Sequence, residues 1–195
     1  MTKVQYFTAC TLDGFIADEH NSLDWLFEVP HDGDGDEGDW DEFISGVGAL
    51  VMGATTYEWM VDRYDMVANP QQWREFYGDR PGWVFTHRDL PRLPGIDIHL
   101  VSGEVRPVYD EIVAAVPDRN IWVLGGGDLV GQLDDAGLLD EIWLGLTPVT
   151  LGAGAPLLPR RITSSRMRVR QARQAGQRVR VVLDVERGQG PGGPG

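Results

Sequence analysis

The stretch IWVLGGGDLVGQLDDA, residues 121–136, decides the fold. Its first four residues are an apolar run that predicts a buried strand, three glycines end that strand, and the residues from about 128 to 136 predict a helix. A second unit of this kind starts at 49–52, where Gly53 ends the strand and the threonine pair at 55–56 is placed to cap the next helix. Repeated strand–glycine–helix units indicate an α/β fold.

The remaining segments continue this alternation. Further strands are predicted at 4–10, 83–86, 96–101 and 140–147, with helices at 39–44 and 105–116. The last ordered segments, 166–174 and 178–187, alternate arginines with apolar residues, which predicts an antiparallel hairpin with its apolar face buried and its arginines in water. We therefore expect a mainly parallel central sheet flanked by helices, with a C-terminal antiparallel hairpin.

The charge balance excludes several classes of partner. The 195 residues include 17 basic and 30 acidic side chains, a formal net charge of −13, so binding to nucleic acid or to an anionic membrane surface is not expected. No apolar run approaches the roughly 18 residues of a membrane span. The single cysteine, Cys10, supports neither a disulfide framework nor a Cys-rich zinc site. We expect a cytoplasmic protein with one domain over 1–187 and a flexible Gly/Pro tail over 188–195.

A long connection over 18–38 is the first candidate for an active-site loop, because connections of this length are usually functional. Aspartates alternate over 32–36 as in an EF-hand, but Glu37 stands where that motif needs glycine and Phe43 where it needs glutamate. The four histidines show no metal-ligand spacing, so no metal site is expected.

The helix that follows this connection offers two carboxylates. Asp39 and Asp41 lie at its start beside Trp40 and Phe43, so one of them is a candidate for a carboxylate in the ligand crevice. Desolvation by the aromatic neighbours would raise the pKa of such a group, as an acid that works near neutral pH requires.

Three strand exits are candidates for ligand binding, because parallel α/β sheets bind ligands beyond the carboxyl ends of their strands. They are Gly53, Thr86 to Arg88, and the glycines at 125–127. Glycines before a helix let the backbone approach a pyrophosphate, and the helix N-terminus supplies partial positive charge. The glycines do not form a dinucleotide-binding fingerprint, since its third glycine would fall at Val130. A merely tight strand-to-helix turn remains the alternative.

His87 and Arg88 follow the strand at 83–86. The planar fork of an arginine suits a phosphate, so this pair is a candidate site for the 2′-phosphate that distinguishes NADPH from NADH. The alternative is an ordinary solvated turn.

Taken together, these segments resemble the dihydrofolate reductase-like superfamily. The resemblance rests on TLDGFIA (11–17), VMGATTYE (51–58), VLGGG (123–127), GLLDE (137–141) and the run TPV, LGAG and PL between 147 and 157. It covers nearly all of residues 2 to 185 and is closest to the branch of the reductase domain of the riboflavin-biosynthesis deaminase-reductase.

The resemblance implies a sheet of eight or nine mainly parallel strands, NADPH rather than NADH bound across the strand ends, and a homodimer. It implies that the nicotinamide ring is flanked by Ala9 and Ile16. It implies roles in cofactor binding for the following residues: Gly53, Thr55 and Thr56 at the pyrophosphate, Thr86, His87 and Arg88 at the adenosine phosphate, and Gly125, Gly126, Gly127, Asp128 and Leu129 at the pyrophosphate and nicotinamide side. The carboxylate of the pterin pocket falls near Asp39, with Asp41 as the neighbouring choice.

The sequence departs from the family pattern in places. Ala54 stands where dihydrofolate reductases carry a basic residue, which leaves more of the 2′-phosphate site to Arg88. The Pro-Trp signature of the folate loop is absent, which argues against folate as the substrate. The ligands of the zinc deaminase half are also missing, so deamination is excluded.

Our hypothesis is an NADPH-dependent reductase that transfers a hydride to a C=N or C=O group of a small pterin-, pyrimidine- or flavin-precursor-like substrate. Asp39 would supply the proton directly or through water. A non-catalytic dinucleotide-binding or redox-sensing module is the alternative.

Overall fold

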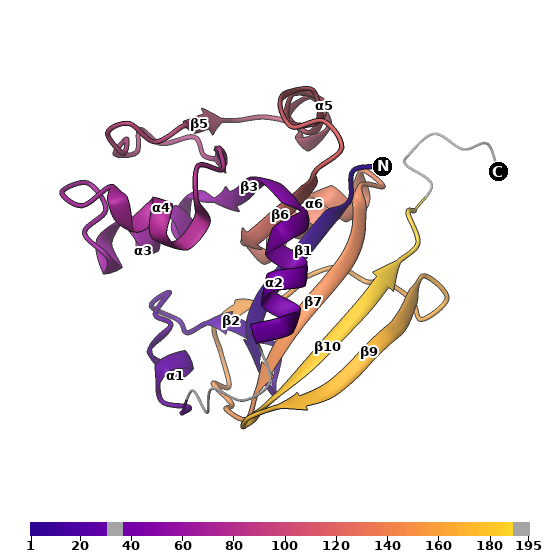
Figure 1. The fold of residues 1–195 in the computed structure, drawn as a ribbon. Helices are drawn as coiled ribbons and strands as arrows, with labels where there is room; N and C mark the ends of the chain where they lie inside the picture. The colour runs from indigo at the N-terminus through magenta and orange to yellow at the C-terminus, as the bar shows by residue number, and fades with distance from the viewer. Residues whose placement is uncertain (31–36, 189–195) are drawn as a thin grey trace.

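An eight-stranded sheet organises the protein (Figure 1). The computed structural model describes residues 1–30 and 37–188, and for residues 37–39 it describes the main chain only. The strand order is β5-β4-β3-β6-β1-β7-β10-β9, parallel from β5 to β7 and antiparallel in the last two strands. The strands are β1 (Val4–Thr11), β3 (Val47–Gly53), β4 (Gly82–Phe85), β5 (Ile98–Val101), β6 (Asn120–Gly125), β7 (Leu139–Thr147), β9 (Met167–Ala175) and β10 (Arg178–Val185).

Helices cover both faces of this sheet. They are α1 (Asp24–Phe27), α2 (Glu37–Gly46), α3 (Ala54–Arg63), α4 (Gln71–Tyr77), α5 (Val105–Ala115) and α6 (Gly127–Asp135). The apolar sides of α5 and α6 form one core cluster with the sheet, and those of α2, α3 and α4 form the other. None of the helices in the described residues is long and apolar enough to cross a membrane.

The predicted fold class is confirmed, and the structure adds elements that the sequence pattern did not reveal. A two-stranded sheet joins β2 (Phe15–Ala17) to β8 (Ala155–Pro156), and α1 and α4 are short helices with a single buried tryptophan each, Trp25 and Trp73. Elements this short carry too few apolar positions to show a helical period. The aspartates at 32–36 and the tail from 189 onward lie outside the described residues.

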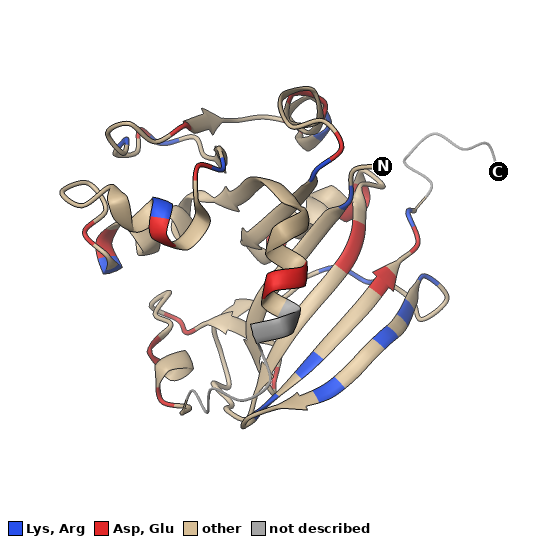
Figure 2. Ribbon diagram, in the orientation of Figure 1, with Lys and Arg blue, Asp and Glu red and all other residues tan. Residues whose placement is uncertain are grey.

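The prediction for the two faces of the C-terminal hairpin is wrong. The hairpin forms, and Figure 2 shows its basic residues along both strands. However, Arg180 is only 5% exposed, whereas Val169 is 60% exposed and Val179 38%. Arg180 and Val182 lie on the face of β10 that is turned towards α2, so the alternation places an arginine beside a valine against the interior.

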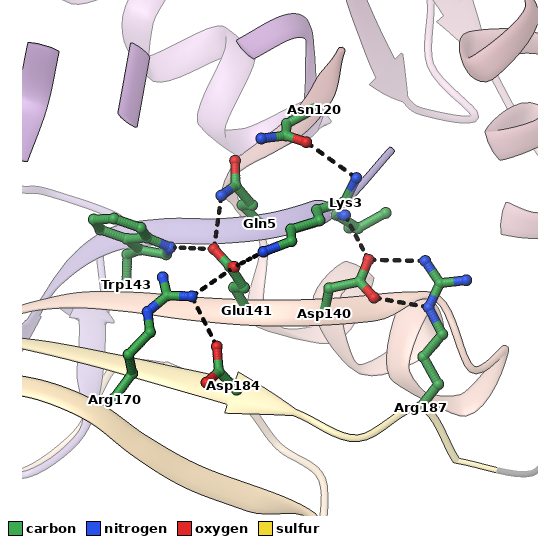
Figure 3. Close-up of polar contacts among 10 residues, drawn as sticks. Lys3, Gln5, Asn120, Asp140, Glu141, Trp143, Arg170, Asp184 and Arg187 are labelled. Carbon is green, nitrogen blue, oxygen red and sulfur yellow. Dashed lines mark hydrogen bonds and ion pairs between the residues drawn. The ribbon is translucent and has the colours of Figure 1, made fainter. Parts of the chain in front are cut away.

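A buried carboxylate fixes β1 against β7 at their amino ends (Figure 3). Glu141 of β7 is 2% exposed. It accepts hydrogen bonds from Lys3 Nζ at 2.6 Å and Gln5 Nε2 at 2.7 Å. Trp143 Nε1 and Arg170 Nη1 each donate to it at 2.8 Å. Each carboxylate oxygen thus accepts two hydrogen bonds, which offset the cost of burial. Because the donors come from β1, β7 and β9 or the residues beside them, the carboxylate links these three strands.

Asp140 makes a second link at the same end. It accepts a hydrogen bond from the backbone N–H of Val4 at 2.8 Å and two from Arg187, Nε at 2.7 Å and Nη2 at 2.9 Å. The bidentate pair ties the chain that follows β10 to the start of β1 and β7.

The charge on Glu141 makes stability depend on pH. Burial alone would raise the pKa of this carboxyl group, but hydrogen bonds from its four partners, Arg170 first, outweigh burial and lower the pKa from 4.5 to about 2. Because the pKa is lower in the folded state, the stabilisation is present above the ordinary pKa and is lost as the pH falls towards about 2.

We expect Glu141→Gln to lower the free energy of unfolding near neutral pH by roughly 3–5 kcal/mol, because it breaks a buried, fully paired charge. The difference in the free energy of unfolding between the variant and the unsubstituted protein should narrow as the pH falls from about 4.5 to 2. Urea titrations at several pH values measure both. Glu58→Gln, which removes the partly exposed partner of Arg88, is the matched control and should change little. A difference that stays constant with pH contradicts this assignment.

Candidate functional site

Two helix N-termini face the same edge of the sheet, and both begin after a glycine. The N-cap of α3 is Gly53 and that of α6 is Gly126, and neither helix has a side-chain hydrogen bond at its cap. Gly126 has φ +97°, a conformation that other residues rarely adopt. The predicted capping of α3 by Thr55 or Thr56 is therefore wrong. The uncapped N–H groups and the helix dipoles make this edge suited to an anion.

The glycines also let the start of α6 lie close to the neighbouring segments. A Cβ on Gly125 would lie 2.6 Å from Thr56 Oγ1, and a Cβ on Gly127 would collide with the carbonyl oxygen of Pro156. A Cβ on Gly126 would lie 3.6 Å from the backbone nitrogen of Gly53. Gly125 thus lets β6 lie close to α3, and Gly127 lets the start of α6 lie close to β8.

These segments enclose a cavity of about 300 Å³, which we call the glycine cavity. Leu124 to Asp128 form one side of it, Thr55, Thr56 and Trp59 of α3 the second, and Ile16 and Ala17 of β2 the third. Asp128 points its carboxylate to Gln132 and Arg160, and these hydrogen bonds lower its pKa. Its charge is therefore already paired within the protein.

An aspartate in the turn before β2 holds the third side of the glycine cavity in place. Asp13 Oδ1 accepts a hydrogen bond from Thr11 Oγ1 at 2.5 Å, and its Oδ2 accepts from the backbone N–H groups of Leu151 and Gly152, at 3.0 and 2.7 Å. The Thr11 bond first, and then the one from Gly152, lowers the pKa of Asp13. Asp13 thus ties the loop of β2 to the loop before β8.

A second, larger cavity of about 820 Å³ adjoins the first. We call it the aromatic cavity, because Phe7, Phe27 and Trp40 line it together with Ala9, Gly145, Arg178 and Arg180. Thr8 lines both cavities. Thr8 is therefore the residue of β1 that the two cavities share.

Most of the predicted cofactor residues come together at this edge. Ile16, Thr55, Thr56 and the segment from Gly125 to Asp128 line the glycine cavity, and Ala9 lines the aromatic cavity. Leu129, a residue of α6, is buried in the core.

The third strand exit lies apart from both cavities. Thr86, His87 and Arg88 follow β4, the neighbour of β3, and do not line either cavity. Thr86 Oγ1 accepts the backbone N–H of Arg88 at 2.9 Å, and the Arg88 side chain pairs with Glu58 of α3 at 2.7 Å. Arg88 is thus directed towards α3, the helix whose Thr55, Thr56 and Trp59 line the glycine cavity.

The two candidate carboxylates lie in the first part of α2. Asp41 is exposed, and the side chain of Asp39 lies outside the described part of the chain. Trp40, between them, lines the aromatic cavity. The helix therefore borders the second cavity, and the choice between the two carboxylates stays a prediction.

Sequence reasoning named Ala9 but missed Gly145 and Arg180, which only strand register brings beside it. Ala9 of β1 pairs with Gly145 of β7, which pairs with Arg180 of β10, and the three form a row across the aromatic cavity. Thr8, where the cavities meet, was missed too. The even-numbered positions 178, 180 and 182 of β10 share one face, and that period was the available signal.

Comparisons with known proteins agree with this architecture. The family described as RibD C-terminal domain matches residues 79–181. The uncharacterized protein YwjB of Bacillus subtilis (strain 168) is 30% identical over 181 residues, 92% of this chain and 95% of that protein. The uncharacterized protein YyaP of the same organism is 24% identical over 155 residues, 76% of each chain.

Solved structures share the fold. A putative riboflavin biosynthesis protein from Shewanella sp. PV-4 has a TM-score of 0.74 and 24% identity, covering 95% of this chain and 100% of that one. A diaminohydroxyphosphoribosylaminopyrimidine deaminase/5-amino-6-(5-phosphoribosylamino)uracil reductase from Thermotoga maritima has a TM-score of 0.65 and 17% identity. The match covers 94% of this chain but 56% of that longer one.

The role of Asp13 is testable by hydrogen exchange. We expect Asp13→Ala to speed the exchange of the Leu151 and Gly152 amides at least tenfold, because both lose their acceptor. Asp18→Ala is the matched control, since Asp18 accepts the amides of His20 and Ser22 within its own loop. Unchanged exchange at 151 and 152 would show that the loop is held by other contacts.

Proposed function

Because this chain belongs to the RibD C-terminal domain family, we propose that it is a reductase that uses NADPH, in preference to NADH, to reduce a C=N or C=O bond of a small pterin-, pyrimidine- or flavin-precursor-like substrate. The observation that carries the proposal is the pair of cavities that meet at Thr8, one walled by two glycine-capped helix N-termini and the other lined by aromatic rings.

The glycine cavity would hold the pyrophosphate part of a dinucleotide. The pyrophosphate would be held through backbone N–H groups and hydroxyls at the N-termini of α3 and α6. The residues are Gly53 at the end of β3, Thr55 and Thr56 on α3, and Gly125, Gly126 and Gly127 at the junction of β6 and α6. Asp128 would lie towards the nicotinamide, which Ala9 and Ile16 would flank. Thr86, His87 and Arg88 would take the 2′-phosphate, for which Arg88 would exchange its surface pair with Glu58.

The protein's own part in the reaction is orientation, exclusion of water and proton supply. The bound cofactor supplies a hydride from its dihydronicotinamide ring. The side chains of Phe7 and Trp40, with centroids 5.8 Å apart, cover the substrate side and keep water from it. Asp39, or Asp41 as the neighbouring choice, would deliver a proton to the substrate heteroatom directly or through water.

The nucleotide site is tested by a charge placed at Thr55. This exposed residue lies in the first turn of α3, where a glutamate favours the helix but repels a phosphate. We expect the unsubstituted protein to bind NADPH more tightly than NADH in a tryptophan-fluorescence titration. Thr55→Glu should weaken NADPH binding at least tenfold without lowering the melting temperature, and Thr55→Gln should weaken it far less. Equal affinities in all three proteins would contradict this site.

The proton source is tested by Asp39→Asn with Asp41→Asn as its matched control one half-turn away. We expect Asp39→Asn to lower kcat at least tenfold with NADPH affinity unchanged, because only proton delivery is removed. Asp41→Asn should change kcat less than twofold. The reverse pattern assigns the role to Asp41. NADPH binding without turnover of any pterin, pyrimidine or quinone would favour the non-catalytic module.

A further inference from the structure

Arg160, in the loop after β8, lies along helix α6 and joins the two ends of that helix. Its Nη2 donates to Asp128 Oδ1 at 3.0 Å, and its Nε donates to Asp135 Oδ2 at 2.9 Å. The two aspartates belong to the first and last turns of α6, and their spacing places them on one face of it. Nη1 donates to the carbonyl oxygen of Pro159 at 2.9 Å, so every nitrogen of the guanidinium group has an acceptor.

The middle of α6 is shaped to receive this side chain. Gly131 lies between the two aspartates, and a Cβ added to it would lie 2.7 Å from Arg160 Cγ and 2.8 Å from its Cζ. The arginine therefore rests directly on the helix, and only 28% of its side chain is exposed. Glycine is a poor helix former, so this close contact comes with a loss of helix propensity at position 131.

Asp128 places a negative charge at the site proposed for a phosphate. It lines the glycine cavity and lies in the first turn of α6, where the helix has no side-chain cap. A carboxylate in the first turn is favourable for the helix dipole, but it repels a phosphate that approaches the same turn. Hydrogen bonds from Gln132 and Arg160 lower the pKa of Asp128, so the group stays ionised at neutral pH.

Arg160 is the cation that offsets this charge. Gln132 Nε2 donates to Asp128 Oδ2 at 2.9 Å, but it carries no charge of its own. Without Arg160, the two aspartates would leave this face of α6 with two negative charges, one of them at the cavity. The ion pairs also tie α6 to the loop of Pro156 and Pro159, which line the same cavity.

We propose that Arg160 is a positioning residue for phosphate binding in the glycine cavity. It neutralises Asp128 and holds the carboxylate along α6, so that the N-terminus of this helix receives a phosphate group without repulsion. Arg160 does not line the cavity itself and acts through Asp128. This inference rests on the proposed function, because it concerns the nucleotide site of the same reductase.

The experiment measures the binding of NADPH and of inorganic pyrophosphate by calorimetry, at low and at high ionic strength. We expect Arg160→Gln to weaken the binding of both probes at least about fivefold at low ionic strength, because the Asp128 carboxylate is then unpaired near the phosphates. The loss should shrink at high ionic strength, since salt screens the repulsion. Arg160→Lys should keep most of the affinity, because it retains the positive charge.

A second substitution separates the charge from the packing of the arginine. Adding Asp128→Asn to Arg160→Gln should recover most of the lost affinity, because it removes the charge that Arg160 offsets. A purely structural role would show no such recovery, since the double variant lacks both partners of the ion pair. Gly131→Ala should also weaken the binding of both probes without lowering the melting temperature, because its methyl group displaces the Arg160 side chain while alanine favours the helix.

Two matched controls leave the pair of Asp128 and Arg160 in place. Arg161→Gln removes the same charge from the next position, which is exposed, and Asp135→Asn removes the other partner of Arg160. Each should change the affinity for both probes less than about twofold.

Equal affinities of Arg160→Gln and the unsubstituted protein for both probes, a loss that Asp128→Asn does not reverse, or a loss of the same size at high ionic strength would each overturn the proposal. Failure of the proposed function has a different signature. Pyrophosphate binding would still depend on Arg160, while NADPH would bind no more tightly than pyrophosphate.

Discussion

The register of β1 between β6 and β7 is the constraint on which the rest of the structure depends. At the amino end, the buried carboxylate of Glu141 binds Lys3 and Gln5 of β1 and fixes that register against β7. At the carboxyl end, the same strand presents Phe7, Thr8 and Ala9 to the cavities. A slip of one residue would turn every side chain of β1 to the other face, so the charge cluster at one end determines the chemistry at the other.

The glycine cavity and the aromatic cavity differ in the groups that line them. Backbone groups dominate the glycine cavity, where helix N-termini and glycines suit a phosphate chain common to many enzymes. Aromatic rings and two arginines line the aromatic cavity. The proposed cofactor and substrate would make these different demands, and Thr8 lines both cavities.

The sequence predicted the features that are formed by neighbouring residues in the chain. It did not predict the aromatic cavity, which forms only when distant strands pair in register. The strand–glycine–helix units around Gly53 and Gly126 are contiguous in sequence, so the sheet and most of the glycine cavity could be predicted from them. The aromatic cavity draws on β1, α2, β7 and β10, which meet only after folding. Arg180 looked like a solvated strand residue because alternation gives the period but not which face is buried.

The central claim is that the two cavities are the cofactor and substrate compartments of one reaction. A crystal structure of the protein with NADP⁺ tests it most directly. The account predicts the pyrophosphate at the N-termini of α3 and α6 and the nicotinamide beside Thr8, with the aromatic cavity still open to a second molecule. A cofactor that lies within the aromatic cavity, or on another face of the sheet, would contradict the account.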